Sequence, residues 1–348
     1  MNRIKRYPNW ILILISTLLV VFLVEFFLRL AGTGYGIAPI EPDQQLHHSH
    51  PRNYEFVSYH PGADFIGHKV FYDEFGYRVK SKNPILGEDD ANRRIAFLGD
   101  GFTEANSVSW EQSFVGLIQS KNPNIVVRNF GVGSYSPVIY LLQIRNEVKS
   151  FKPTDLVVQI FENDFYDDNK YLKKANSTTL SEIEIVSGEV SNTDRAKKIF
   201  RHSYFARLIR KAQLQLSFLL LDKINGSNEN LLPNEGNLTN ENKKKITYEA
   251  ILLLKDFADK INTRIFFFVV PNKQLTLQNQ CCELDALAIE FYNFAAANDL
   301  NLIDLPKAFE NYLDQSKLFF EKDVHFTAEG HLVTAEVISK KLQLSEKK

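Results

Sequence analysis

Short segments beside predicted strands and helices carry side chains that could form a catalytic site. Asp323 and His325 stand two residues apart, just before the predicted last helix. An imidazole oriented by a nearby carboxylate is the usual form of a general base. Asn163 and Asp164 follow a predicted strand, and the Asn163 amide offers an uncharged N–H₂ donor to a developing oxyanion. These residue types predict a site that combines a base with oxyanion stabilisation.

A position where a reactive side chain would be expected holds a glycine. The run Ile95–Leu98 is wholly apolar and stops at Gly99-Asp100-Gly101, which predicts a buried strand followed by a turn. In an open α/β sheet the chemistry lies just beyond the carboxyl end of a strand, and Gly101 stands there without a side chain. Thr103 should point elsewhere if the turn is tight, so it is no convincing substitute. Read alone, Gly-Asp-Gly is also ordinary turn chemistry.

A glycine-containing turn follows the second predicted strand, between Gly131 and Pro137. A glycine at 131 lets the backbone approach a ligand, and its N–H can point into the site. The alternative is a plain strand–helix turn with Ser136 as the N-cap and Pro137 at the first helical position. Both interpretations can hold together. His331 is a second candidate for the base, but it falls inside the last helix pattern and is expected to pack in the core.

Neither histidines nor cysteines predict a metal site. Four histidines in the segment 31–92 lack helical spacing and a nearby carboxylate pair, so a solvated loop is expected: His47, His48, His50 and His60. Cys281 and Cys282 are adjacent, where a disulfide would be strained, and two thiols cannot complete a zinc site. We therefore assign no metal and no other cofactor.

Five strand-like runs alternate with five helical patterns, which predicts βαβ units and a parallel sheet covered on both faces. The strand-like runs are Ile95–Leu98, Ile125–Phe130, Leu156–Phe161, Ile265–Val270 and Leu302–Leu305. The helical patterns are Glu111–Gln119, Ser136–Val148, Lys243–Lys260, Asp285–Ala297 and Ala328–Leu342.

The N-terminus has the pattern of a membrane anchor. Residues 1–9 are basic, and residues 10–30 are apolar and just long enough to cross a bilayer as a helix. Since no comparable basic segment follows, the N-terminus is expected in the cytoplasm and the main domain in the periplasm or outside the cell. A cleaved signal peptide is the competing interpretation, but we find no suitable cleavage site. Glu25 and Arg29 lie one helical turn apart and are expected to pair.

The rest of the chain divides into a loop-rich lead-in at 31–92, expected to carry a few short strands and to lie on the main domain, and a main domain at 93–345, interrupted by an insertion at about 165–242. The insertion contains an amphipathic helix around Tyr204–Asp222, whose leucine-rich run could lie on the membrane surface, although core packing is expected. The chain has 348 residues, 44% of them hydrophobic, which indicates a globular protein. Its formal net charge of -1 gives no reason to expect nucleic acid.

The order of these segments resembles the SGNH (GDSL-type) esterases and acyltransferases, and in particular a membrane-anchored bacterial branch of that family. Gly99-Asp100 matches the family's Gly-Asp-Ser, but Gly101 replaces the serine. Asn163-Asp164 matches the end of Gly-x-Asn-Asp, but Phe161 replaces the glycine. The spacing from Asp323 to His325 is one residue shorter than the family's usual Asp-x-x-His. The resemblance covers about 93–344 without the insertion.

The resemblance implies a flavodoxin-like parallel sheet flanked by helices, preceded here by a transmembrane helix. It implies that Asp323 and His325 are the acid and base, with an oxyanion hole formed by Asn163 and the N–H groups of Gly101 and Gly131. Asp100 and Asp164 would support these residues.

Two functions remain open. The first is a membrane-anchored, extracytoplasmic ester hydrolase or O-acyltransferase that acts on an acylated glycan or lipid. It is expected to be impaired, because Gly101 has no oxygen to attack a carbonyl unless His325 activates a water. The second is a catalytically inactive pseudoenzyme that binds a glycan or a partner protein.

Overall fold

A five-stranded parallel sheet forms the centre of the molecule. The computed structural model describes residues 9–82, 93–191, 198, 200–225, 241–277 and 286–344. The strands lie in the order β11-β10-β9-β7-β8, the flavodoxin-like order in which the first strand lies between the second and third. They are β7 (Arg94–Leu98), β8 (Val126–Asn129), β9 (Asp155–Ile160), β10 (Arg264–Val269) and β11 (Asn301–Ile303). The expected fold class is confirmed.

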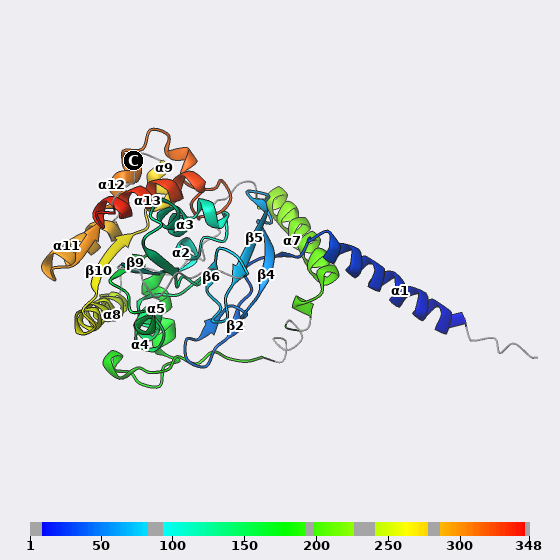
Figure 1. The fold of residues 1–348 in the computed structure, drawn as a ribbon, viewed down its shortest axis with the longest axis horizontal. Helices are drawn as coiled ribbons and strands as arrows, with labels where there is room; N and C mark the ends of the chain where they lie inside the picture. Colours follow the sequence, from blue (N-terminus) through cyan, green and yellow to red (C-terminus); the bar gives the residue numbers. More distant parts are fainter. Residues whose placement is uncertain are drawn as a thin grey trace, which may run out of the picture.

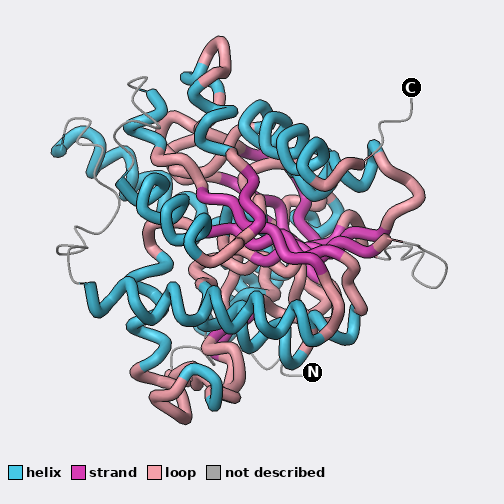
Figure 2. The backbone as a smooth tube through the Cα atoms, turned by 90° about the vertical axis from the view of Figure 1, so that its left-hand side faces the viewer, coloured by secondary structure: helices cyan, strands magenta, loops and turns pink. Residues whose placement is uncertain are grey.

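Helices cover both faces of this sheet (Figures 1 and 2). One face packs against α4 (Pro137–Asn146), α8 (Glu241–Lys260) and α11 (Ala286–Ala297), and α5 (Asp164–Leu172) lies against α4 and α8. The other face packs against α3 (Phe114–Lys121), α12 (Leu305–Glu310) and α13 (Ala328–Lys341). The strands are apolar on both faces because both are buried.

The sequence predicted these strands and most of these helices to within one or two residues. The helix expected at Glu111–Gln119 divides into a 3₁₀ turn at Trp110–Gln112 and α3, and the sequence did not predict α5 or α12. Ser136 does occupy the N-cap of α4 with Pro137 after it, as expected. However, the Ser136 hydroxyl donates to Asp168, and it is the Asp168 carboxylate that accepts the N–H of Val138.

The described part of the lead-in, residues 31–82, contains the short strands that the sequence predicted. It forms a sheet in the order β1-β4-β5-β6 and a two-stranded ladder, β2-β3. Their bounds are β1 (Tyr35–Gly36), β2 (Glu41–Pro42), β3 (His48–Ser49), β4 (Glu55–Tyr59), β5 (Ile66–Tyr72) and β6 (Arg78–Val79). The solvated loop expected for the histidines is wrong for His48 and His50, which are 6% and 1% exposed. His48 contacts the carbonyl of Gly133, and His50 contacts that of Pro39.

A buried arginine joins the lead-in to the main domain. The Arg78 side chain on β6 donates hydrogen bonds to the carbonyls of Glu104, Ala105 and Val108, at 2.8 Å to Glu104 and 2.7 Å to Val108. These carbonyls follow the four-residue helix α2 (Gly101–Glu104). Ala105 ends α2 in the left-handed conformation, at φ 60°, so its carbonyl faces away from the helix ladder. The planar guanidinium satisfies these carbonyls together.

The N-terminal helix and the helix of the insertion that packs against it were only partly predicted. Helix α1 (Asn9–Leu30) is long and apolar enough to cross a membrane, and none of it is buried. The expected Glu25–Arg29 pair forms at 2.7 Å. Helix α7 (Tyr204–Asn225) lies against α1 and β1 (Figure 1). The core packing expected for its leucine-rich run is wrong, because four leucines are more than half exposed: Leu216, Leu219, Leu220 and Leu221.

Replacing Arg78 with lysine tests the link between lead-in and main domain. One ammonium cannot satisfy three separated carbonyls, so Arg78→Lys should lower the free energy of unfolding by roughly 1–3 kcal/mol. The measurement is chemical denaturation of the full chain in detergent. Arg52→Lys, at an exposed position of the lead-in, is the control and should change it by less than about 0.5 kcal/mol. Equal effects of the two changes would contradict this role for Arg78.

Candidate active site

Helix α2 begins directly after β7, at the carboxyl edge of the sheet. Asp100 is its N-cap and accepts the N–H of Phe102 at 2.9 Å. Gln159 on the neighbouring strand β9 donates to Asp100 at 2.5 Å and accepts from both the N–H and the hydroxyl of Thr103. These contacts fix the first turn of α2 and orient the Thr103 hydroxyl into the core. As expected, Thr103 points away from the site.

The imidazole of His325 lies directly against Gly101. A Cβ built on Gly101 would come within 2.5 Å of His325 Nε2, with the ring carbons at 3.4 and 3.5 Å. The imidazole therefore points its Nε2 at the position where a nucleophile's side chain would begin. It also occupies part of the volume that this side chain would need. The structure brings together the expected base and the expected nucleophile position.

Asp323 holds the other side of the same ring. One carboxylate oxygen lies 2.5 Å from His325 Nδ1 and accepts the backbone N–H of His325 at 2.7 Å. Because only one residue separates Asp323 from His325, the same carboxylate oxygen reaches both the backbone N–H and the ring of His325. With Nδ1 directed at the carboxylate, Nε2 is left to face Gly101.

The pair strongly favours the charged imidazolium. Burial alone would lower the pKa of His325, but the charge and the hydrogen bond of Asp323 outweigh it and raise the pKa to about 9. Burial alone would raise the pKa of Asp323. The charge and the hydrogen bonds of His325 outweigh burial and lower this pKa. The raised His325 pKa stabilises the folded state fully below pH 6.5, and this stabilisation is lost as the pH rises through about 9.

A second histidine, which the sequence did not suggest, approaches the Asp323 carboxylate from the lead-in. His60 Nε2 lies 3.7 Å from the second oxygen of Asp323, and His60 Nδ1 lies 3.8 Å from Asp64. The N–H of Gly62 donates to His60 Nδ1 at 3.2 Å, so Nδ1 is the acceptor and Nε2 carries the proton that faces Asp323. No local pattern around His60 reveals this contact, because its partner comes from the far end of the chain.

Two of the groups expected to form the oxyanion hole, the Asn163 amide and the Gly131 N–H, already have hydrogen-bond partners. The Asn163 amide donates to Asp167 at 3.1 Å, while its oxygen is buried without a partner among the described residues. The N–H of Gly131 donates to the Asn129 side chain at 2.9 Å. A Cβ at Gly131 would lie 2.6 Å from the N of Glu104, so glycine is required for this loop to pack against α2.

Asp164 begins α5 and accepts the N–H of Phe161 at 3.0 Å. Burial and the nearby charges of Asp100 and Asp168 hold the pKa of Asp164 well above its ordinary range. Burial also raises the pKa of Asp100. Each carboxyl accepts a backbone N–H at the carboxyl edge of the sheet, that of Phe102 for Asp100 and that of Phe161 for Asp164.

Behind α2 lies a buried polar cluster that the sequence did not reveal. Glu104 is 2% exposed and lies 2.8 Å from His50 Nε2, 2.6 Å from the Tyr72 hydroxyl and 3.1 Å from the N of Gly133, and it also contacts Asn106. Burial would raise the pKa of Glu104, but His50 and the hydrogen bonds lower it to about 2. Glu104 thus stays ionised and ties α2 to the lead-in sheet and to the Gly131–Gly133 turn.

His331 does not reach the site. It is fully buried in α13 between the rings of Phe114 and Phe326, and burial lowers its pKa to about 3. Cys281 and Cys282 lie outside the described residues.

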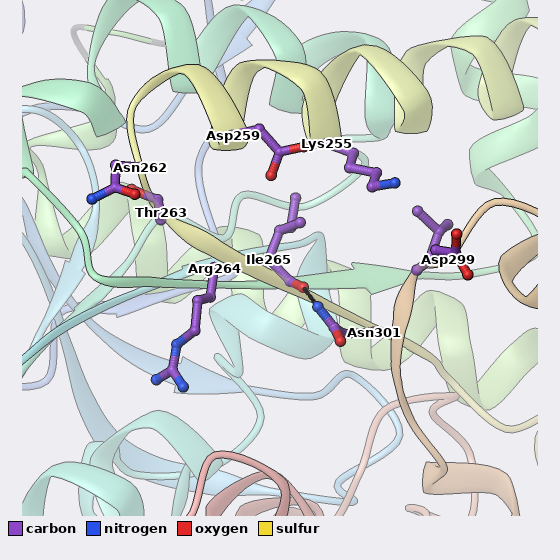
Figure 3. Close-up of a pocket in the computed structure, with 9 residues that line it drawn as sticks. Lys255, Asp259, Asn262, Thr263, Arg264, Ile265, Asp299 and Asn301 are labelled. Atoms are coloured by element: carbon purple, nitrogen blue, oxygen red, sulfur yellow. Dashed lines mark hydrogen bonds between the residues drawn. The ribbon is translucent and has the colours of Figure 1, made fainter.

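A cavity of about 280 Å³ lies at the opposite edge of the sheet, where β10 and β11 begin. Figure 3 shows Lys255 and Asp259 reaching toward it from α8, with Arg264 and Asn301 on the strands below. None of the residues around Gly101 lines it.

Comparison with solved structures finds similar overall arrangements among lipases and esterases. A GDSL-like lipase from Bacteroides thetaiotaomicron has 13% identity and a TM-score of 0.40, over 75% of this chain and 90% of that chain. A catalytic mutant of an acetylxylan esterase from Geobacillus stearothermophilus has 13% identity and a TM-score of 0.43, over 75% and 99%. No protein-family model and no curated protein matches the chain. At these values the likeness assigns no residue a role.

Changing Asp323 to asparagine should lower the His325 pKa from about 9, because the imidazolium loses its charged acceptor. The measurement is an NMR titration of the histidine ring in both proteins. Asp314→Asn, at an exposed carboxylate of the same region, is the control and should leave the curve in place. An unchanged titration in Asp323→Asn would mean that the carboxylate does not hold the ring.

Proposed function

We propose that this chain is a membrane-anchored, extracytoplasmic protein of SGNH type, built as an ester hydrolase or O-acyltransferase for an acylated glycan or lipid. The chemistry is impaired as the chain stands, because Gly101 supplies no nucleophile. The observation that carries the proposal is the contact of His325 Nε2 with the Cβ position of Gly101. A nucleophile–base pair requires a base that a carboxylate orients toward the nucleophile's side chain. His325 is oriented by Asp323 in this way, toward the position where a side chain at residue 101 would begin.

The same contact favours a second candidate function, that of a pseudoenzyme. Because His325 Nε2 lies within 2.5 Å of where the Cβ would be, the site has closed over the position of the side chain. A group whose pKa is about 9 is mostly protonated at neutral pH, so it can donate a hydrogen bond to an ester carbonyl or a carboxylate. In this form the protein would bind an acylated glycan or a partner without turning it over.

Gly101→Ser separates the two functions. The imidazole is the end of a side chain, so it can retreat until the serine hydroxyl lies about 2.6–3.2 Å from Nε2. We expect hydrolysis of a short-chain activated ester to rise by several orders of magnitude, since loss of a triad nucleophile costs on the order of a millionfold. The rate should increase with pH up to about 9, because the unprotonated imidazole is the base.

The double change Gly101→Ser with His325→Ala is the matched control. If Gly101→Ser stays as inactive as this double variant, the site is not assembled for catalysis and the binding function is favoured. If the unaltered chain already equals Gly101→Ser, the reaction uses another group, such as a water activated by His325, and our assignment of the nucleophile position is wrong.

We also propose that α1 is a retained anchor and not a cleaved signal peptide. Glu25 accepts the N–H groups of Tyr204 and Phe205, at 3.0 and 2.9 Å, and the Ser203 hydroxyl at 3.0 Å. Arg29 donates to the carbonyl of His202 at 2.5 Å. These contacts cap the start of α7, and cleavage after α1 would leave those N–H groups without the carboxylate.

Protease added to spheroplasts tests the orientation. With a cytoplasmic N-terminus, the domain beyond residue 31 should be digested from outside while a cytoplasmic marker protein survives. Lysed cells, in which both are digested, give the control. A domain that remains fully protected in intact spheroplasts would refute the orientation.

A further inference from the structure

We infer that one face of α7 lies on the lipid surface of the membrane that holds α1. This inference rests on the proposed anchor and extends it, because it gives the main domain a second contact with the bilayer. The face, which we call the α7 stripe, consists of Ile209, Leu216, Leu219 and Leu220.

The stripe is apolar, and the described residues leave it exposed. Its four side chains are between 44% and 59% exposed. Their spacing of seven, three and one residues places them on one side of a helix. A group of large apolar side chains on one exposed helix face marks an interaction surface, unlike single apolar residues scattered over a protein.

The opposite side of α7 packs against the protein along much of its length, although Leu221 near its end is exposed. Arg207 donates to the carbonyl of Gly34 at 3.1 Å, and the Lys211 ammonium lies 3.4 Å from the centre of the Tyr35 ring. Phe218 packs edge-on against His60, the histidine beside Asp323. Since these contacts fix the rotation of α7, the stripe cannot turn inward to join the core.

The connection to α1 identifies the bilayer as the occupant. With 22 residues, α1 is about as long as a bilayer core is thick, so its last turns lie at the outer boundary. Glu25, which caps α7, precedes Leu30 by five residues, or about 7.5 Å of helix. The start of α7 therefore lies within about 7.5 Å of the boundary between lipid and water. Arg210, exposed beside the stripe, suits lipid headgroups.

Spin labels report the depth of the stripe directly. In the full chain in lipid vesicles, with Cys281→Ser and Cys282→Ser, single cysteines would carry a nitroxide at 216, 209, 19 or 313. Position 19 lies in α1. Leu313 is fully exposed and follows α12 in the chain, and α12 lies on the side of the molecule away from α1 (Figure 1). Oxygen, which concentrates in lipid, and a water-soluble nickel chelate serve as the two relaxing agents.

We expect Leu216→Cys and Ile209→Cys to resemble Leu19→Cys, with greater exposure to oxygen than to the chelate, and Leu313→Cys to show the reverse. If labels at 216 and 209 behave like the label at 313, the stripe faces water and the inference is wrong. If they are shielded from both agents, another protein or a second copy covers the stripe, and the inference is equally wrong. A water-exposed label at 19 would refute the anchor itself, which distinguishes the two failures.

Discussion

Helix α2 lies where it does because buried polar groups hold it on every side. Gln159 and Asp100 satisfy its first turn, while Arg78 binds the carbonyls at its end. Glu104 anchors it from behind. An unpaired polar group in this dry environment costs more free energy than a surface contact gains, so these groups must all be satisfied together. The contact between Gly101 and His325 depends on that positioning.

The lead-in completes the main domain and does more than connect it to the anchor. His50 of the lead-in forms an ion pair with the carboxylate of Glu104, and the Tyr72 hydroxyl donates a hydrogen bond to it. His60 of the lead-in faces the carboxylate of Asp323. Two carboxylates, the buried one of Glu104 and the partly exposed one of Asp323, thus contact side chains that precede β7. Helix α7 extends this connection, because Phe218 contacts His60 and Glu25 of α1 caps the same helix.

The sequence predicted what depends on local pattern and missed what depends on distant partners. Short apolar runs such as Ile95–Leu98 identify strands buried on both faces, and parallel strands bring residues at their carboxyl ends together. The segment holding His50 and His60 is polar and rich in proline, so it resembled a solvated loop. Only the folded chain shows that His50 lies against the carboxylate of Glu104 and His60 against that of Asp323. The leucine-rich run on α7 was misassigned to the core because both sides of this helix carry large apolar residues.

The protonation state of His325 connects the two candidate functions. At neutral pH its pKa of about 9 keeps the ring charged beside Asp323. A charged ring directs an N–H at the site and acts as a donor to an oxygen of the ligand, whereas a base must present a free lone pair. Because Gly101 has no hydroxyl, it cannot accept a hydrogen bond from His325 Nε2–H. A bound ligand would be the acceptor for this N–H. A serine in place of Gly101 would compete for the same nitrogen. The glycine therefore determines which of the two roles this imidazole can play.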